Sequence, residues 1–192
     1  MFFLARIMGA LYFINNIDDK DLVARSRRSL IGNSVLFLVF FLSFVIRTLL
    51  ADGYAVNPET GEVFMEPYKY LTNFIEMPLV LVLFLIGVVL VLFGIGKSLL
   101  KTKFDKGIWF TGIGTVLAVL ALLLVAGYNN TAYYPSTNDL QSSLTLANSC
   151  SSQFTLRVMF YVSFLVPFVL AYIFYAWRSI DIHKISEKEM KD

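Results

Sequence analysis

The chain has 192 residues, of which 57% are hydrophobic and 16% are charged, and its formal net charge is +2. Soluble domains average about 45–50% apolar and about 25% charged residues, so one soluble core could not hide most of these side chains. The small net charge leaves no electrostatic footprint for nucleic acid, and we expect no nucleic-acid partner. The single cysteine, Cys150, excludes an internal disulfide and a cysteine-ligated zinc or iron–sulfur centre.

The N-terminal segment, residues 1–30, combines an apolar stretch with a charged one. Residues 1–17 are apolar apart from Arg6, and they are few for a membrane span, which needs about 20 residues. A signal peptide fits the length, but Arg6 lies inside the apolar part and no small-residue cleavage site follows. We therefore expect a short apolar helix, either lying at the membrane interface or forming the end of a spanning helix whose start is missing.

Four later stretches contain no Asp, Glu, Lys, Arg or His: residues 31–46, 77–96, 107–128 and 158–177. A helix of about 20 residues crosses a hydrocarbon core of about 30 Å. The stretches are continuously apolar rather than alternating, and three are about twice the length of a barrel strand, which favours helices over a β-barrel. The sequence predicts an all-α membrane protein with a four-helix transmembrane bundle over residues 31–178, its spans at about 31–51, 76–97, 107–128 and 156–178.

The basic residues are distributed unevenly between the loops. Thirteen of the sixteen lie in residues 1–30, 97–107 and 178–192. The other two loops and their helix ends hold only Arg47, Lys69 and Arg157. The positive-inside rule reads this asymmetry as a protein with both termini in the cytoplasm. Residues 179–192 would then form a cytoplasmic tail.

Two features within the apolar stretches bear on helix geometry. Pro167 lies in the middle of the fourth stretch, where it should kink the helix. Gly112 and Gly114 could permit close packing of the third helix.

The search for reactive groups in the predicted spans finds few. No span contains a histidine, the usual axial ligand of a haem, and the single histidine, His183, is in the charged tail. A proton relay would need several carboxylates within the membrane, whereas only Glu76 lies near a span, at its end. We expect no catalytic, cofactor-binding or metal-binding residue in this chain.

Two charges at the predicted outer ends of helices need an explanation. Arg47 lies about one turn before the end of the first span, and Glu76 lies just before the second. An ion pair between Arg47 and Glu76 would satisfy both charges where lipid penalises an unpaired one. The alternative is that Arg47 reaches the lipid headgroups and Glu76 is hydrated.

Several short sequence blocks resemble those of one known family in their residues, order and spacing. They are 10–12 (Ala-Leu-Tyr), 22–25 with Arg27, 52–54 (Asp-Gly-Tyr), 135–137 (Pro-Ser-Thr), 143–145 (Ser-Leu-Thr), 151–153 (Ser-Ser-Gln) and 155–159 (Thr-Leu-Arg-Val-Met). The chain resembles subunit II of the cytochrome bd-type quinol oxidases. No single block is a catalytic signature, and the resemblance covers only the C-terminal half of a family member, since such proteins have eight spans in two four-helix bundles. The resemblance therefore implies that residues 1–30 are the truncated end of the fourth helix followed by a cytoplasmic segment.

The resemblance implies a part of a bacterial complex that oxidises quinol and reduces dioxygen to water. In that family haems b and d and the quinol-oxidising loop belong to subunit I. Subunit II packs against subunit I, and in some members it contributes a proton path and holds a structural quinone. The partners implied are therefore subunit I, the missing N-terminal half of subunit II, membrane lipid and quinone, in the bacterial cytoplasmic (inner) membrane. The chain alone is expected to be non-catalytic and to bind no cofactor.

Two other interpretations stay open at this point. A small polytopic transporter or channel component is one, although such a protein should show a broken helix or a polar site at the membrane midplane. The scattered polar or kinking positions are Ser43, Thr111, Thr115, Ser163 and Pro167. A non-functional fragment is the other interpretation.

Overall fold

The computed structural model describes residues 1–101, 104–180 and 185–186. Helices make up most of the structure, in the order α1 (Phe2–Asn16), α2 (Lys20–Leu50), α3 (Lys69–Glu76), α4 (Pro78–Leu100), α5 (Gly107–Gly127), α6 (Leu146–Ser149), α7 (Gln153–Ser163) and α8 (Val166–Ile180). A short 3₁₀ helix, Leu140–Ser142, precedes α6. The strands are short: β1 (Ile17–Asp18), β2 (Gly53–Val56), β3 (Val63–Glu66) and β4 (Ile185–Ser186).

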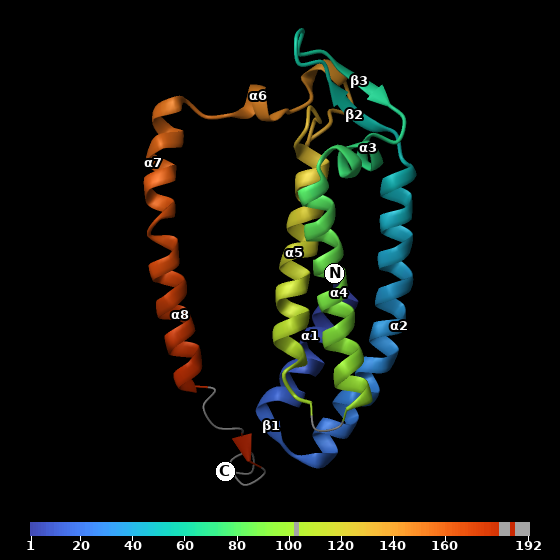
Figure 1. Cartoon of the computed structure of the whole chain (residues 1–192), viewed down its shortest axis with the longest axis vertical. Coiled ribbons are helices and arrows are strands. Elements are labelled where there is room, and N and C mark those ends of the chain that lie inside the picture. The colour runs from blue at the N-terminus through green and yellow to red at the C-terminus, as the bar shows by residue number, and fades with distance from the viewer. Residues whose placement is uncertain (102–103, 181–184, 187–192) are drawn as a thin grey trace.

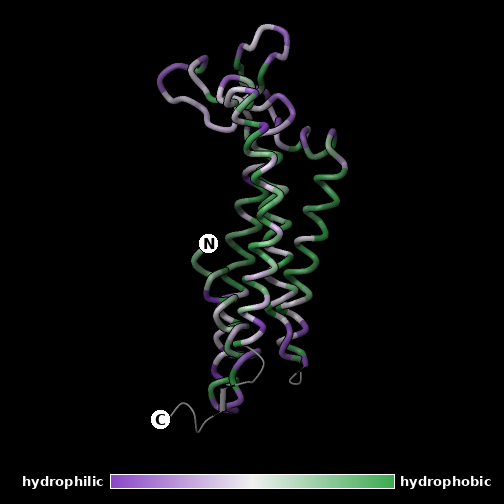
Figure 2. Tube along the Cα trace, turned by 90° about the vertical axis from the view of Figure 1, so that its left-hand side faces the viewer, coloured by the Kyte–Doolittle hydropathy of each residue, from purple (hydrophilic) through white to green (hydrophobic). Residues whose placement is uncertain are grey.

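Four helical segments are long and apolar enough to cross a membrane: α2, α4, α5 and the combined α7–α8 segment Gln153–Ile180. The prediction of an all-α membrane protein with four spans is therefore confirmed. Figure 2 shows hydrophobic residues along the helices and hydrophilic ones gathered at the two ends of the molecule. The strands and the short helices α3 and α6 lie at these ends (Figure 1).

The first span is longer than its charge-free stretch. Helix α2 begins at Lys20 because the Asp19 carboxylate caps it, accepting hydrogen bonds from the backbone N–H groups of Asp21 and Leu22. No proline or glycine interrupts the charged residues that follow, so the helix runs through them. The absence of charge thus marked the most apolar part of α2 rather than the start of the helix.

Helix α1 packs against α2 and α5. It runs antiparallel to the first part of α2, and Met1 lies part-way up the molecule (Figure 1). Ile7, Leu11 and Ile14 are buried in one cluster with Leu30 of α2. This burial does not fit a helix lying flat at a membrane interface.

Helices α4 and α5 are the most closely packed pair. A Cβ atom on Gly87 would lie 2.6 Å from the backbone nitrogen of Ala118, and one on Gly94 would lie 2.9 Å from that of Thr111. A Cβ on Gly114 would lie 2.6 Å from the carbonyl oxygen of Gly87. The expected packing role of Gly114 is confirmed. Gly112 has a different neighbour, the tip of Met8 at 3.5 Å.

The last span differs from the predicted bundle. Helices α1, α2, α4 and α5 pack together, whereas α7 and α8 stand apart from them (Figure 1). None of the most apolar window of Gln153–Ile180 is buried. Apolar composition shows that a helix is covered by lipid or protein but not by which one, so the sequence could not show that this span lacks neighbours within the described chain.

The expected kink at Pro167 is confirmed. Helix α7 ends at Ser163 and α8 begins at Val166. Because Pro167 has no N–H to donate to the carbonyl of Ser163, the α-helical pattern is interrupted there. The backbone N–H groups of Phe164 and Leu165 bond to the carbonyls of Tyr161 and Val162, at 3.2 and 2.9 Å, in a tighter turn.

The strands form two small pairs. β2 and β3 form an antiparallel hairpin with Gly53 opposite Glu66 and Val56 opposite Val63. β1 pairs in parallel with β4, which brings residues 17–18 beside residues 185–186 at the other end of the molecule. We call these two ends the hairpin end and the basic end.

Candidate functional site

The most developed polar arrangement lies at the hairpin end. Asn73 of α3 is fully buried. Its side-chain nitrogen donates to the carbonyl of Val125 at 2.9 Å and to the Thr131 hydroxyl at 2.8 Å. Its side-chain oxygen accepts from the Asn129 side chain at 3.1 Å, and Asn129 also donates to the Glu76 carboxylate at 2.5 Å. We call Asn73, Glu76, Asn129 and Thr131 the Asn73 cluster.

The Asn73 cluster also fixes the hairpin. Asn129 and Asn130 adopt the left-handed backbone conformation, with φ of 55° and 53°, which asparagine tolerates better than most residues. The carbonyl of Asn130 then accepts from the N–H of Val56 at 2.8 Å, and Thr131 forms a bridge with Ala55. The segment after α5 therefore extends the β2–β3 sheet by a few residues.

Gly53, in the Asp-Gly-Tyr block of the resemblance, has a packing role. A Cβ at Gly53 would lie 2.6 Å from the Cβ of Lys69, so only glycine lets β2 and α3 approach this closely. Lys69 is buried and its ammonium pairs with the Glu66 carboxylate at 3.3 Å. Burial, and then the neighbouring Tyr54, raises the pKa of the Tyr70 hydroxyl above its usual value.

The blocks in the loop before the last span also shape the backbone. The Ser143 hydroxyl accepts from the N–H of Ser136 at 3.0 Å, which holds the Pro-Ser-Thr and Ser-Leu-Thr blocks together. Thr145 and Asn148 form a reciprocal cap at the start of α6. The side chain of Gln141 makes two hydrogen bonds with the backbone of Val63, at 3.0 and 2.9 Å. These residues order the loop on the hairpin.

The structure does not bring Arg47 and Glu76 together. Both side chains are exposed, and the ion pair recorded among residues 1–101 and 104–180 joins Lys69 and Glu66. The expected Arg47–Glu76 pair is corrected for this reason: Glu76 ends a separate helix, α3, which turns its carboxylate toward Asn129 beyond α5.

At the basic end, Arg27 joins α2 to the end of α4 and the loop that follows it. Its guanidinium donates to the carbonyl oxygens of Ser98, Lys101 and Phe104, the last two at 3.3 and 3.4 Å. These contacts cap the C-terminus of α4, where a cation also meets the negative end of the helix dipole. The ammonium of Lys97 lies 4.6 Å from the ring centre of Phe104, a cation–π contact in the same turn.

Groups that could hold a metal or haem are scarce in the described chain. No grouping of three or more His, Cys, Asp or Glu side chains occurs among those residues. His183 lies outside the described residues, as does most of the 179–192 tail. Cys150 is exposed, at the end of α6.

An apolar pocket of about 390 Å³ lies next to the start of α1. Met1, Phe3, Phe37, Phe41 and Leu122 are among its lining residues, so α1, α2 and α5 all contribute to it. The lining includes one hydroxyl, that of Thr115, which donates to the carbonyl of Thr111 in its own helix at 2.7 Å. The pocket therefore suits an alkyl group rather than a polar one.

Sequence reasoning missed most of this polar architecture. Asn73, Asn129 and Thr131 carry no charge and belong to none of the motifs that the sequence analysis singled out. The usable signal was the pair Asn129-Asn130 directly after a helix, because consecutive asparagines favour left-handed turns.

Comparison with known proteins adds the family. The model of the family described as cytochrome bd terminal oxidase subunit II matches residues 1–180. Three similar proteins, from Escherichia coli K12, O6:H1 and O157:H7, are each named cytochrome bd-I ubiquinol oxidase subunit 2. Each is 32% identical over 131 residues, which cover 67% of this chain and 33% of the relative.

The matched residues thus span about a third of the length of these curated relatives. The family match nevertheless runs from α1 to the end of α8, so it covers all four membrane-spanning segments. On this ground the chain belongs to the cytochrome bd terminal oxidase subunit II family.

Proposed function

We propose that this chain forms part of subunit II of a cytochrome bd-type quinol:oxygen oxidoreductase in the aerobic respiratory chain. The observation that carries the proposal is the family match over residues 1–180. In this role the chain transfers no electrons itself and supports the haem-bearing subunit I.

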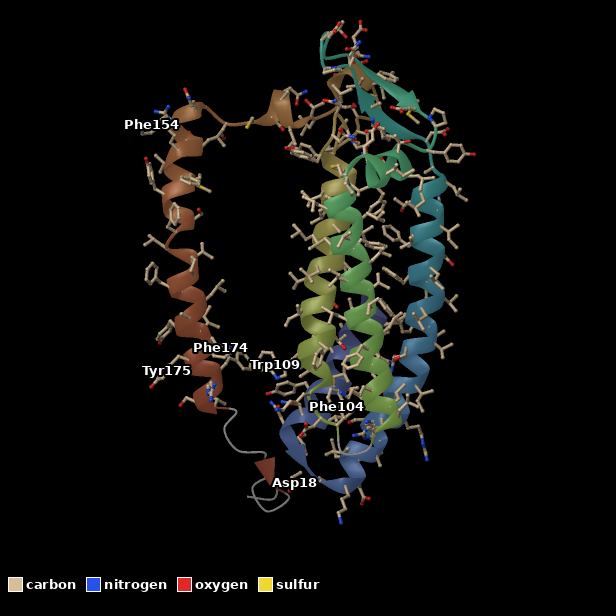
Figure 3. The ribbon with its side chains drawn as sticks, viewed as in Figure 1. Asp18, Phe104, Trp109, Phe154, Phe174 and Tyr175 are labelled. Carbon is tan, nitrogen blue, oxygen red and sulfur yellow. The ribbon has the colours of Figure 1, made fainter. Side chains whose placement is uncertain are left out.

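The exposed apolar surface supports a role inside a larger membrane complex. Every described residue of α7 and α8 except Ala176 is exposed, large aromatic side chains such as Phe168 and Tyr172 included. Figure 3 shows Phe174 pointing toward Trp109 of α5, while Tyr175 and Phe154 point away from the other helices. A span so little covered by its own chain is suited to packing against helices of subunit I or of the rest of subunit II, as well as against lipid.

We assign haems b and d to subunit I and none to this chain. The argument rests on the sequence, in which no spanning segment contains a histidine. A structural quinone is a further component of the proposed complex.

A transporter is less well supported, because most of the polar side chains in the spans donate hydrogen bonds within their own helices. Ser43 donates to the carbonyl of Val39, Thr115 to that of Thr111 and Ser163 to that of Phe160, each within its own helix. Thr111 is buried against Gly94 between α4 and α5, and its hydroxyl has no hydrogen-bond partner within the described chain. These contacts explain the polar residues as parts of helices rather than as a shared midplane site.

We further propose the bacterial cytoplasmic membrane as the location, with both termini on the cytoplasmic side. The support is the distribution of basic residues, since Arg25, Arg27, Arg28, Lys97 and Lys106 gather at the basic end while the hairpin end carries Glu59, Glu62 and Glu66.

The subunit role is tested by purifying the tagged chain alone and after coexpression with subunit I and the N-terminal half of subunit II. The chain alone should show no b- or d-type bands in a reduced-minus-oxidised spectrum. The coexpressed chain should bring both bands with it through the affinity step. Stoichiometric haem in the chain alone, or no haem in the coexpressed eluate despite folded subunit I in the membrane, would contradict the proposal.

A further inference from the structure

A groove between α1 and α2 at the basic end is not used by any of the contacts described above. Its volume is about 530 Å³, and it opens to the surroundings. One wall is the face of α1 between Arg6 and Phe13. The other wall is the face of α2 that carries Leu22, Arg25, Ser26 and Ser29.

The charges lining this groove have one sign. Arg6 and Arg25 come from the two facing helices, and no Asp or Glu is among the lining residues. Neither guanidinium is in an ion pair with a carboxylate in the described part of the chain, although Asp21 lies one turn before Arg25 on the same helix. Two guanidinium groups on opposite walls can donate several hydrogen bonds to one anion between them.

Hydroxyl groups and apolar side chains complete the groove. Ser26 is buried, and the Ser29 hydroxyl oxygen accepts from the Asn33 side chain at 3.0 Å, which leaves its hydrogen for another acceptor. Phe13 and Leu22 add an apolar surface beside the cations. This combination of cations, hydroxyl donors and apolar side chains matches a phosphate group that is attached to hydrocarbon.

We propose that this groove binds the phosphate group of an anionic phospholipid in the membrane leaflet at the basic end. Basic pockets between membrane helices are typical sites for anionic headgroups. The inference is independent of the oxidase role, because it rests on the groove alone.

The apolar pocket supports a lipid rather than a free phosphate ion. Both helices of the groove contribute to it, with Phe3 of α1 and Phe37, Phe40 and Phe41 of α2 among its residues, and α4 and α5 complete the lining. From Arg25 and Ser26 to this part of α2 the helix rises by roughly 20 Å at 1.5 Å per residue. An acyl chain of common length covers this distance along α2, whose exposed side chains there include Ile31 and Val35.

Native mass spectrometry of the full chain, released from nanodiscs, tests the proposal. The nanodiscs contain phosphatidylglycerol and phosphatidylcholine with identical acyl chains in equal amounts. We expect the chain to retain one phosphatidylglycerol molecule in strong preference to phosphatidylcholine. The variants Arg6→Gln and Arg25→Gln should each lower this retention about fivefold, as expected for one cation at a membrane surface.

Two further variants separate a built site from general charge attraction. Arg28→Gln removes an exposed arginine of the same helix that does not line the groove, and it should change retention less than twofold. Gly9→Leu keeps every charge but fills the groove, at a position where an added Cβ meets nothing within 4 Å, so the fold should tolerate it. It should abolish the preference.

Several results would overturn the proposal. Equal losses in Arg28→Gln and Arg25→Gln would mean general attraction of the basic end for anionic lipid. An unchanged preference in Gly9→Leu would place the lipid elsewhere. Competition by soluble glycerol phosphate at the same concentration as the lipid would assign the site to a free phosphate compound instead. Failure of the haem copurification described above would leave all of these outcomes unaffected.

Discussion

At the scale of single residues, the Asn73 side chain makes hydrogen bonds to three groups that lie outside its own helix. Its partners are the Val125 carbonyl, the Thr131 hydroxyl and the Asn129 amide, so one buried amide joins α3 to the end of α5 and to the segment beyond. Buried polar networks of this kind are stabilising only while every member is satisfied. The stability of the hairpin end should therefore depend strongly on this residue.

Replacement of Asn73 by alanine should destabilise the protein by about 1–3 kcal/mol, because it removes the side-chain donor to the Val125 carbonyl and one of the two hydrogen bonds of the Thr131 hydroxyl, which still donates to Asn129. Unfolding in mixed detergent micelles, followed by circular dichroism, measures the change. Thr72→Val is the matched control, since the Thr72 hydroxyl bonds to Tyr68 within its own helix, and it should shift stability by less than about 0.5 kcal/mol. Equal effects of the two substitutions would mean that the network contributes nothing specific.

The charges at the hairpin end give a second residue-level prediction. A double-mutant cycle on Glu76→Gln and Asn129→Ala should show a coupling of about 0.5–2 kcal/mol, because the two side chains are hydrogen-bonded at 2.5 Å. The cycle on Glu76→Gln and Arg47→Gln should be additive, because both of those side chains are exposed and do not pair. Coupling in the second cycle and additivity in the first would restore the ion pair expected from the sequence.

These residues show where sequence reasoning succeeds and where it stops. Arg47 and Glu76 were chosen because both are charges at the ends of neighbouring spans, which a one-dimensional pattern can show. The direction of the Glu76 carboxylate depends on α3. Its N-cap residue Tyr68 has φ of 56°, and no pattern in the sequence indicated that turn. Asn73 was missed because an uncharged side chain has no signal until its neighbours are known.

At the scale of elements, the close approach of α4 and α5 depends on glycines that the sequence identified only in part. Membrane helices associate through small residues because lipid offers no hydrophobic force between them. Gly87 and Gly94 of α4 face Ala118 and Thr111 of α5 at distances that exclude a side chain. Gly114 could be predicted from composition, but Gly87 and Gly94 required knowledge of which faces meet.

Substitution of Gly94 by alanine should destabilise the α4–α5 pair by about 1–3 kcal/mol, because the new methyl group overlaps Thr111 and the carbonyl of Gly107. Gly96→Ala is the control in the same helix: an added Cβ there meets nothing within 4 Å, and alanine favours a helix. Thermal unfolding in detergent should show a loss for Gly94→Ala and no loss for Gly96→Ala. A neutral Gly94→Ala would mean that the helices separate at no cost.

The ends of the spans show a similar division. The charge-free stretches located all four spans, and Pro167 located the break between α7 and α8. The sequence placed the start of the first span after the polar segment that in fact forms the first part of α2. A helix that is capped by Asp19 can begin in a polar segment, because capping needs no apolar residues. Local patterns therefore gave the presence of each span more securely than its limits.

At the scale of the whole molecule, the described chain is a compact group of helices with one span beside it. The position of α7–α8 could not be predicted from the sequence. Its apolar side chains show that something covers this span, but they do not show which residues or lipids do so. The same exposed span is what makes a partner-dependent role the natural interpretation. Its orientation in the membrane is the first property to establish.

Cys150 provides a direct test of that orientation. It is exposed at the hairpin end, so a membrane-impermeant maleimide should label it in intact spheroplasts. In the matched variant with Cys150→Ser and Lys20→Cys, the thiol lies at the basic end and should react only after permeabilisation. The reverse pattern in the two proteins would show that the chain crosses the membrane in the opposite sense.

The most direct test of the proposed role is quinol-driven oxygen uptake by membranes from a host that lacks its own terminal oxidases. Subunit I and the N-terminal half of subunit II are expressed with or without this chain, and uptake is measured after addition of a reduced quinol. We predict that uptake and the d-type haem band appear only when this chain is present, and that the chain alone supports no uptake. Equal uptake with and without the chain, at equal amounts of subunit I, would contradict its assignment as a working part of subunit II.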